Sequence, residues 1–460
     1  MPMSKIGVRL KGVVRVWLAF VCELASVGTV ASSFVLSLDA CSDASRGGAL
    51  QVSQTRIDPV DSVACQGCHD THYQAWSLSM HAYAADDPIF VAMNARGQRE
   101  TGGSLGDFCV RCHAPLALKS GATADGLNLA AVPAKLRGVT CLVCHGAALA
   151  ADGSVEFTDD ASMQGPIADP LHTPAHGSAY AVDLDRRQGQ SVTLCGACHA
   201  VTNLHGLEVE RTADEWRTTS YALPSTLRTC GRCHMAESTG AAATVPGAPV
   251  RPVHEHAMPG VDLGEGSPLQ KKFVEQTLDP AISSKLCVVP AVDGVQLSVT
   301  LDNALVGHAW PSGATHNRRA WLELVAYTGA DVAYSSGVVG PDEAVTASAS
   351  PPLILLREQL FDDSGQPTFF MWNATTARSL LLAPATGDPL HSTQTAAVKV
   401  AANVDRVTAR VRVRALDYDV VDALVASGDL APSYARGLPT LSVAATVQEW
   451  TADRGAACLP

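Results

Sequence analysis

The sequence predicts two regions of different fold class: a mostly helix-and-loop region built around a repeated motif, followed by an antiparallel β-sandwich. Two observations lead to this prediction. Every copy of a cysteine–histidine motif lies before residue 235, in a stretch with little regular hydrophobic periodicity. Beyond about residue 291, apolar and polar residues alternate with a period of two, which is typical of half-buried antiparallel strands.

The repeated motif is Cys-x-x-Cys-His, which is the attachment signature of a c-type haem. The two thiols bond to the porphyrin, and the imidazole that follows lies under the iron. Zinc ribbons and redox pairs also use Cys-x-x-Cys, but they do not need a histidine after every pair. The five copies are Cys65–His69, Cys109–His113, Cys141–His145, Cys195–His199 and Cys230–His234.

Five copies predict five covalently bound haem c groups, so we expect residues 61–270 to form a haem-dominated pentahaem cytochrome c domain. Only 5% of all residues are aromatic, which fits a core made largely of porphyrin. The expected proximal iron ligands are His69, His113, His145, His199 and His234. The cysteines expected to bind haem are Cys65, Cys68, Cys109, Cys112, Cys141, Cys144, Cys195, Cys198, Cys230 and Cys233.

The N-terminal sequence predicts an export signal. Within residues 1–40, a basic stretch precedes a mostly apolar run from 16 to 38, as in a signal peptide or a membrane anchor. The residues before Cys41 resemble a bacterial lipoprotein processing site, with Cys41 as the acylated residue. Lipidation, plain cleavage and an uncleaved anchor helix all stay open. Each places the rest of the chain in the periplasm or at the cell surface, with residues 41–60 as a flexible linker.

Residues 291–460 are predicted to form the β-sandwich, roughly of immunoglobulin type, after a connector at 271–290. The alternation is clear from Val407 to Arg414. Cys287 and Cys458 stand near the two ends of this region. In an oxidising compartment we expect a disulfide between them, with two unpaired thiols as the alternative.

The chain is acidic, with a formal net charge of −12. Nucleic acid is not expected as a partner, because phosphate binding needs a basic surface. A basic redox protein or another cytochrome suits such a charge better.

Ten histidines remain after the five proximal ones, enough to supply a second axial ligand to every iron. Bis-histidine ligation suits electron transfer. Methionine is the other common distal ligand, but the chain has only eight methionines. Histidine is therefore the expected distal ligand.

The first motif is followed by Tyr73, Trp76, Ser79 and His81-Ala82. This pattern resembles the opening of the multihaem cytochromes related to the tetrahaem electron carrier of ammonia oxidisers, and the resemblance covers about residues 61–260. Further landmarks are Phe108, Gly138-Val139-Thr140, Glu215-Trp216 and Met235, with weaker likeness in Gly307–Gly313 and Arg319–Glu323.

The resemblance implies a set of distal ligands. His172 competes with His176 for one position, and His254 competes with His256 for another. His308 would reach from the β-region and make that region a lid on one haem. His72, His316 and His391 are expected to be ordinary hydrogen-bonded or exposed side chains. The distal ligands expected are His81, His176, His205, His256 and His308.

These observations favour an extracytoplasmic electron-transfer protein. One alternative is an oxidoreductase that acts on a small nitrogen or sulfur oxyanion at one five-coordinate haem. A second is a structural or docking subunit of an extracellular haem assembly. The sequence leaves open whether the protein is an enzyme.

Overall fold

The computed structural model describes residues 58–150, 155–157, 163–167, 175–264, 266–386, 392–434 and 436–459. All of them belong to one compact unit, Val52–Pro460. The predictions for residues 1–40, Cys41, His172 and His391 lie outside the described residues. Among the residues described, no helix is long and apolar enough to cross a membrane.

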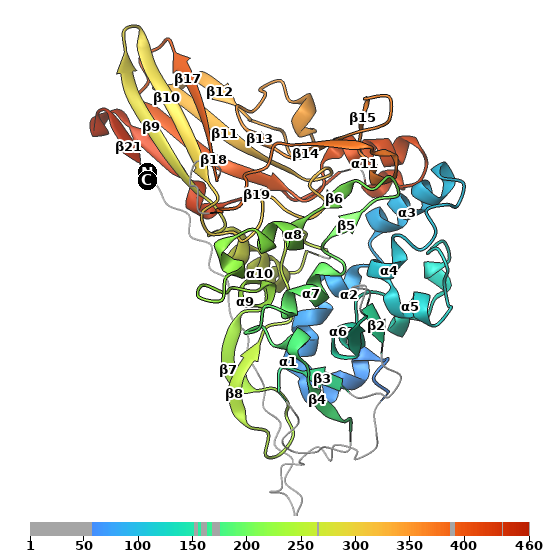
Figure 1. Cartoon of the computed structure of the whole chain (residues 1–460). Coiled ribbons are helices and arrows are strands. Elements are labelled where there is room, and N and C mark those ends of the chain that lie inside the picture. The colour runs from blue at the N-terminus through green and yellow to red at the C-terminus, as the bar shows by residue number, and fades with distance from the viewer. Residues whose placement is uncertain are drawn as a thin grey trace, which may run out of the picture. The chain divides into compact units, whose positions relative to one another are not determined.

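The first half of this unit consists of short helices joined by loops and two-stranded sheets (Figure 1). Its helices are α1 (Ser62–Ser77), α2 (Met80–Tyr83), α3 (Pro88–Glu100), α4 (Val110–His113), α5 (Pro115–Lys119), α6 (Cys141–His145), α7 (Ser191–Gly196), α8 (Thr212–Arg217), α9 (Cys230–His234) and α10 (Pro268–Leu278). Its strands are β1 (Ala147–Leu149), β2 (Val155–Phe157), β3 (Met163–Gly165), β4 (Ser178–Tyr180), β5 (Val201–Thr202), β6 (Glu208–Glu210), β7 (Glu237–Ala241) and β8 (Val250–His254).

Side-chain caps set the starts of the longer helices. Asp61 accepts a hydrogen bond from Val63 N at the start of α1, and Asp87 does the same for Ile89 N at the start of α3. Such caps satisfy amide groups that have no partner inside the helix. The helix starts are thus fixed locally, and α3 also packs through Phe90 and Ala92 into apolar clusters.

The second half is built from antiparallel sheets (Figure 1). One sheet has the order β17-β10-β9-β21, and the other has the order β12-β11-β18-β19, with β13 on β11 and β20 on β18. A smaller sheet has the order β15-β14-β16. The elements are β9 (Ser283–Ala291), β10 (Gly294–Asp302), β11 (Arg319–Thr328), β12 (Asp331–Ser336), β13 (Leu355–Leu356), β14 (Glu358–Phe361), β15 (Pro367–Thr368), β16 (Thr376–Ser379), β17 (Thr393–Val400), β18 (Arg406–Arg414), α11 (Tyr418–Ala426), β19 (Leu441–Ser442), β20 (Gln448–Thr451) and β21 (Ala457–Leu459).

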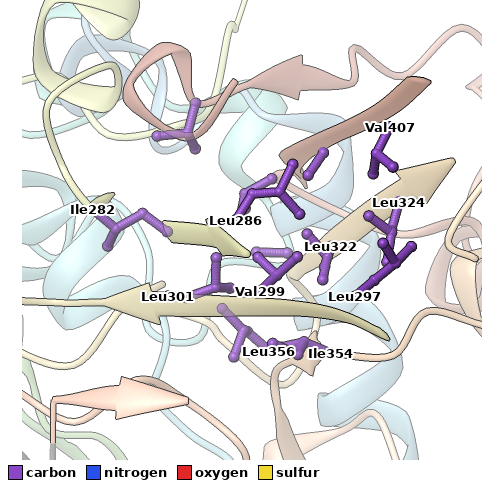
Figure 2. Packing of buried hydrophobic residues seen from close by; sticks show 14 of the residues in the cluster. Ile282, Leu286, Leu297, Val299, Leu301, Leu322, Leu324, Ile354, Leu356 and Val407 are labelled. Carbon is purple, nitrogen blue, oxygen red and sulfur yellow. The ribbon is translucent and has the colours of Figure 1, made fainter. Parts of the chain in front are cut away.

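The period-two alternation places alternate strand residues in a buried core, as predicted. On β10, Leu297, Val299 and Leu301 are buried while the residues between them are partly exposed. They pack with Leu322 and Leu324 of β11 in one cluster, so the two large sheets share a core (Figure 2). The prediction of antiparallel strands in this region is confirmed.

The predicted disulfide is present between Cys287 and Cys458. The two residues lie directly opposite each other on β9 and the edge strand β21. The bond therefore fastens the C-terminal strand to its sheet and closes a loop with a sequence separation of 171 residues.

Replacing both Cys287 and Cys458 by serine should lower the free energy of unfolding of the sheets by about 3–5 kcal/mol, because the unfolded chain gains the entropy of a long open loop. Denaturant unfolding followed by the β-sheet circular dichroism signal measures this. A reductant should weaken the wild type similarly and leave the double variant unchanged. Equal stability of the oxidised wild type and the double variant would contradict this account.

Candidate functional site

A continuous cavity of about 2640 Å³ runs through the first half of the unit, and residues of all five motifs line it. Ordinary small-molecule pockets measure roughly 300–1,000 Å³, so this space suits several large groups. The ten motif cysteines carry free thiols, available for bonding to such groups. The residues present therefore fit covalently attached haem.

The local fold of each motif presents its thiols together. In α6 and α9 the whole motif forms one short helix, from the first cysteine to the histidine. Residues three positions apart lie on the same helix face, so the two thiols of a motif point the same way. In α1 the backbone leaves helical geometry at His69, where φ is −113° and ψ is 40°. That kink lies at the proposed iron-binding residue.

Imidazole rings face each other across the cavity in four pairs. Metal–imidazole bonds are about 2.0–2.1 Å long in zinc sites, and bonds of that length would hold two rings on opposite sides of one metal ion with their centroids about 6 Å apart. Four pairs of rings from different segments show this separation, and so do His69 and His72, which lie three residues apart on α1. The four pairs are His69–His176 at 6.1 Å, His81–His199 at 6.2 Å, His145–His256 at 6.1 Å and His234–His308 at 6.4 Å.

Backbone carbonyls orient most of these rings. Because a carbonyl can only accept, the Nδ1 atom that it meets carries the proton, and Nε2 keeps the lone pair that a metal needs. On the proximal side the Nδ1–oxygen distances are 2.7 Å for His69–Ala242, 3.0 Å for His113–Ala84, 2.6 Å for His145–Gln164 and 2.9 Å for His234–Pro259. On the opposite side they are 3.1 Å for His176–Gly177, 2.8 Å for His256–His254 and 2.9 Å for His308–Ala309.

Burial also favours the neutral form of several of these rings, which is the form that binds metal. It lowers the pKa of His256 to about 3 and that of His308 to about 4. The same cause lowers the pKa of His113, His145 and His234.

The geometry bears on the alternatives that the sequence left open. His256 faces His145, whereas His254 has its Nε2 3.8 Å from a carboxylate oxygen of Glu237. His256 is thus the better placed of the two. His176 faces His69, and its rival His172 lies outside the described residues.

His205 does not lie where the sequence prediction needs it. Its Nε2 is 3.0 Å from the backbone oxygen of Trp372, to which it donates. It lies in the turn between β5 and β6, which Asn203 fastens to the second half by hydrogen bonds of 2.7 Å to the oxygens of Met371 and Ala374. The geometry therefore gives no support to His205 as a distal ligand.

His113 differs from the other motif histidines. Its ring stacks on Phe90, with centroids 3.9 Å apart and planes 5° apart. Among the described histidines, none lies opposite His113 at the spacing of the four pairs.

The sequence landmarks Gly307–Gly313 and Glu215-Trp216 meet at His308. A Cβ atom on the neighbouring Gly307 would lie 2.9 Å from the ring of Tyr221 and 3.3 Å from that of Trp216. On the other side, Ala309 N donates to Glu215 Oε2 over 2.9 Å. The first half of the chain therefore holds His308 in place from both sides.

A second set of sequence landmarks, around Ser79 and Gly138, holds the helix that carries His81 in place. Ser79 caps α2 by accepting from Ala82 N. Gly138 has φ of +76°, and a Cβ there would lie 2.5 Å from the oxygen of Ala82. The next residue, Val139, donates to the oxygen of His81 and accepts from Trp76 Nε1, at 2.8 Å each. Glycine is therefore required where this segment crosses α2.

Sequence reasoning missed three residues at or near the cavity. His72 packs edge-on against His256, with ring centroids 4.7 Å apart. The expectation of a hydrogen-bonded or exposed side chain is wrong for His316, which is fully buried and has no hydrogen-bond partner for either ring nitrogen among the described residues. Met258 lies 3.2 Å from His81 Nδ1 through its sulfur. Neither the His72–His256 contact nor the Met258–His81 contact has a local sequence signal.

Glu210 is a half-buried acid in the cavity wall, beside Cys112 and Cys198. Burial raises its pKa to about 7, and the nearby Arg318 opposes that rise. The carboxyl therefore holds a proton in mildly acidic solution.

Comparison with known proteins agrees with this picture. Residues 64–146 match a family described as cytochrome c554 and c-prime. Among solved structures, a penta-heme cytochrome c552 from Thermochromatium tepidum has a similar fold, with a TM-score of 0.61 and 22% identity, covering 86% of this chain and 100% of that one. No curated protein matches the chain significantly. The matches support a multihaem c-type cytochrome with covalently bound haem c.

Changing Glu210 to glutamine should flatten the pH dependence of stability. Between the usual pKa of 4.5 and the folded value of about 7, the folded state keeps a proton that the unfolded state releases. The free energy of unfolding therefore falls as pH rises through this window, by about 3 kcal/mol at most. Denaturant unfolding at pH 5 and pH 8 should show a smaller fall in Glu210→Gln than in wild type. Glu208→Gln, exposed on the same strand, should behave as wild type; an unchanged slope in Glu210→Gln would refute the account.

Proposed function

We propose that this protein carries electrons outside the cytoplasm through five covalently bound haem c groups. The observation that carries the proposal is the set of four imidazole pairs about 6 Å apart in one cavity that is also lined by nine of the ten free motif thiols. When bound, haem c supplies an iron that gains or loses one electron.

In this proposal the cysteines of each motif bind the porphyrin and the motif histidines are the proximal ligands. His81, His176, His256 and His308 are the distal ligands of four irons. Carbonyl contacts at Nδ1 hold most of these imidazoles in fixed orientations. Rings held in this way move little when the charge on the metal changes, which favours rapid electron transfer.

The attachment points lie close together, which supports transfer between haems. Thiols of different motifs lie close to one another, and Cys144 of the third motif lies near both thiols of the fourth. The fourth motif therefore neighbours the second, third and fifth. The thiol contacts are Cys65–Cys141, Cys112–Cys198 and Cys195–Cys230.

We infer that the C-terminal sheets form a β-sandwich that serves as a lid on the haem region. It supplies His308, and its Glu358 binds Arg211 of the first half over 2.8 Å. Glu358 is almost fully buried, so this ion pair is shielded from solvent.

A pyridine haemochrome assay on the purified protein tests the haem count. We expect five haems per chain, and a count that falls by one when Cys141 and Cys144 are both changed to alanine. A count clearly below five in the wild type would overturn the proposal.

A second function is favoured by His113, which has no described imidazole opposite it. Its iron would then have an open position, as the reduction or oxidation of a small nitrogen or sulfur oxyanion requires. In this second function Glu210, beside Cys112, holds a proton for the reaction, whereas Arg318 in the same wall is ion-paired with Asp262 over 2.8 Å.

Titration with carbon monoxide should show one binding equivalent per reduced chain, because only the His113 site is expected to be open. Changing His308 to alanine should raise this to two, since it removes the ligand opposite His234. Changing His205 to alanine should leave it at one. Absence of binding in the wild type would contradict an open His113 site.

A further inference from the structure

One short segment contacts three of the proposed haem sites. His256 faces His145, the Met258 sulfur lies 3.2 Å from His81 Nδ1, and the Pro259 oxygen lies 2.9 Å from His234 Nδ1. Residues 256–259 therefore supply a proposed ligand to the third motif site and contacts behind the ligands of the fourth and fifth.

The backbone at Met258 is unusual. Its φ of +42° makes it the one non-glycine residue with a positive φ among those described. That conformation is uncommon for residues with a side chain and persists where the surroundings fix it. Residues on both sides of Met258 are held, because His256 bonds to the oxygen of His254 and Pro259 accepts from His234. The constraint directs the Met258 sulfur at His81.

The contact makes the His81–His199 pair different from the other three pairs. In the other pairs both rings have a backbone carbonyl behind Nδ1. Behind His81 the acceptor is a thioether sulfur, which is a weak acceptor. Behind His199 no hydrogen-bond acceptor lies within the part of the chain that the structure describes.

The acceptor behind Nδ1 controls how strongly the ring donates to a metal. A strong acceptor increases the basicity of the ligating nitrogen and so stabilises the ferric state, whereas a weak acceptor does this less. The haem between His81 and His199 should therefore be easier to reduce than its bis-histidine neighbours.

We propose that Met258 is a positioning residue that gives the His81–His199 haem the highest reduction potential of the four bis-histidine haems. This inference rests on the proposed function, since it requires those haems to be bound. The fourth motif neighbours three others, so electrons entering from any of them would collect at this junction.

Spectroscopic potentiometric titration of the holoprotein tests the proposal. Met258→Gln places an amide oxygen, a stronger acceptor, near His81 Nδ1 and should lower one bis-histidine potential. Outer-shell partners of metal-bound histidine commonly change affinity tenfold or more, and a tenfold change corresponds to about 59 mV for one electron. Met258→Leu supplies no acceptor and should not lower that potential.

Two controls locate the effect. His81→Met changes a ligand of the same haem and identifies its component in the titration. Met80→Gln alters a neighbouring methionine whose sulfur faces Gly264, and should leave all potentials unchanged.

The proposal is overturned if Met258→Gln leaves every potential unchanged, or if Met258→Leu lowers the same potential equally. It is also overturned if the component identified by His81→Met is not the highest of the bis-histidine set in the wild type, a result that needs no Met258 variant. A wild type without five haems would instead refute the proposed function.

Discussion

The hydrogen bond from a histidine Nδ1 to a backbone carbonyl is the interaction on which the first half of this protein depends. It fixes the ring tautomer, leaves Nε2 for a metal and sets the direction in which the ring faces. On the proximal side each such carbonyl belongs to a distant segment that runs past the ring, whereas His176, His256 and His308 meet carbonyls within two residues of themselves. These bonds hold segments between the motifs beside the imidazoles, and several small apolar clusters pack around them.

The need to hold each imidazole in a fixed position also explains why the β-region packs against the haem region. His308 completes a pair with His234 and comes from a segment between strands of this region. Gly307 fits against Trp216 and Tyr221, and Glu215 binds the backbone at Ala309. The sheets have their own apolar core and a disulfide, so they can hold that loop rigidly. One face of the haem region is thus supplied by a separately stabilised structure.

Features encoded locally could be predicted from the sequence. The Cys-x-x-Cys-His motifs, the alternation on β10 and β18 and the Cys287–Cys458 disulfide needed only spacing, periodicity and compartment. Pairing of histidines could not be derived in this way, because His81 meets His199 through contacts between distant segments. His205 illustrates the limit, since a histidine close to a motif in sequence instead binds Trp372 in the second half. The Met258 contact depends on a single left-handed backbone conformation, for which methionine gives no signal.

The most direct test of the central claim is a count of spin states in the oxidised holoprotein by electron paramagnetic resonance. Four paired sites and one unpaired site predict four low-spin ferric haems and one high-spin ferric haem per chain. More than one high-spin haem would contradict the assignment of the four histidine pairs, and five low-spin haems would contradict the open site at His113.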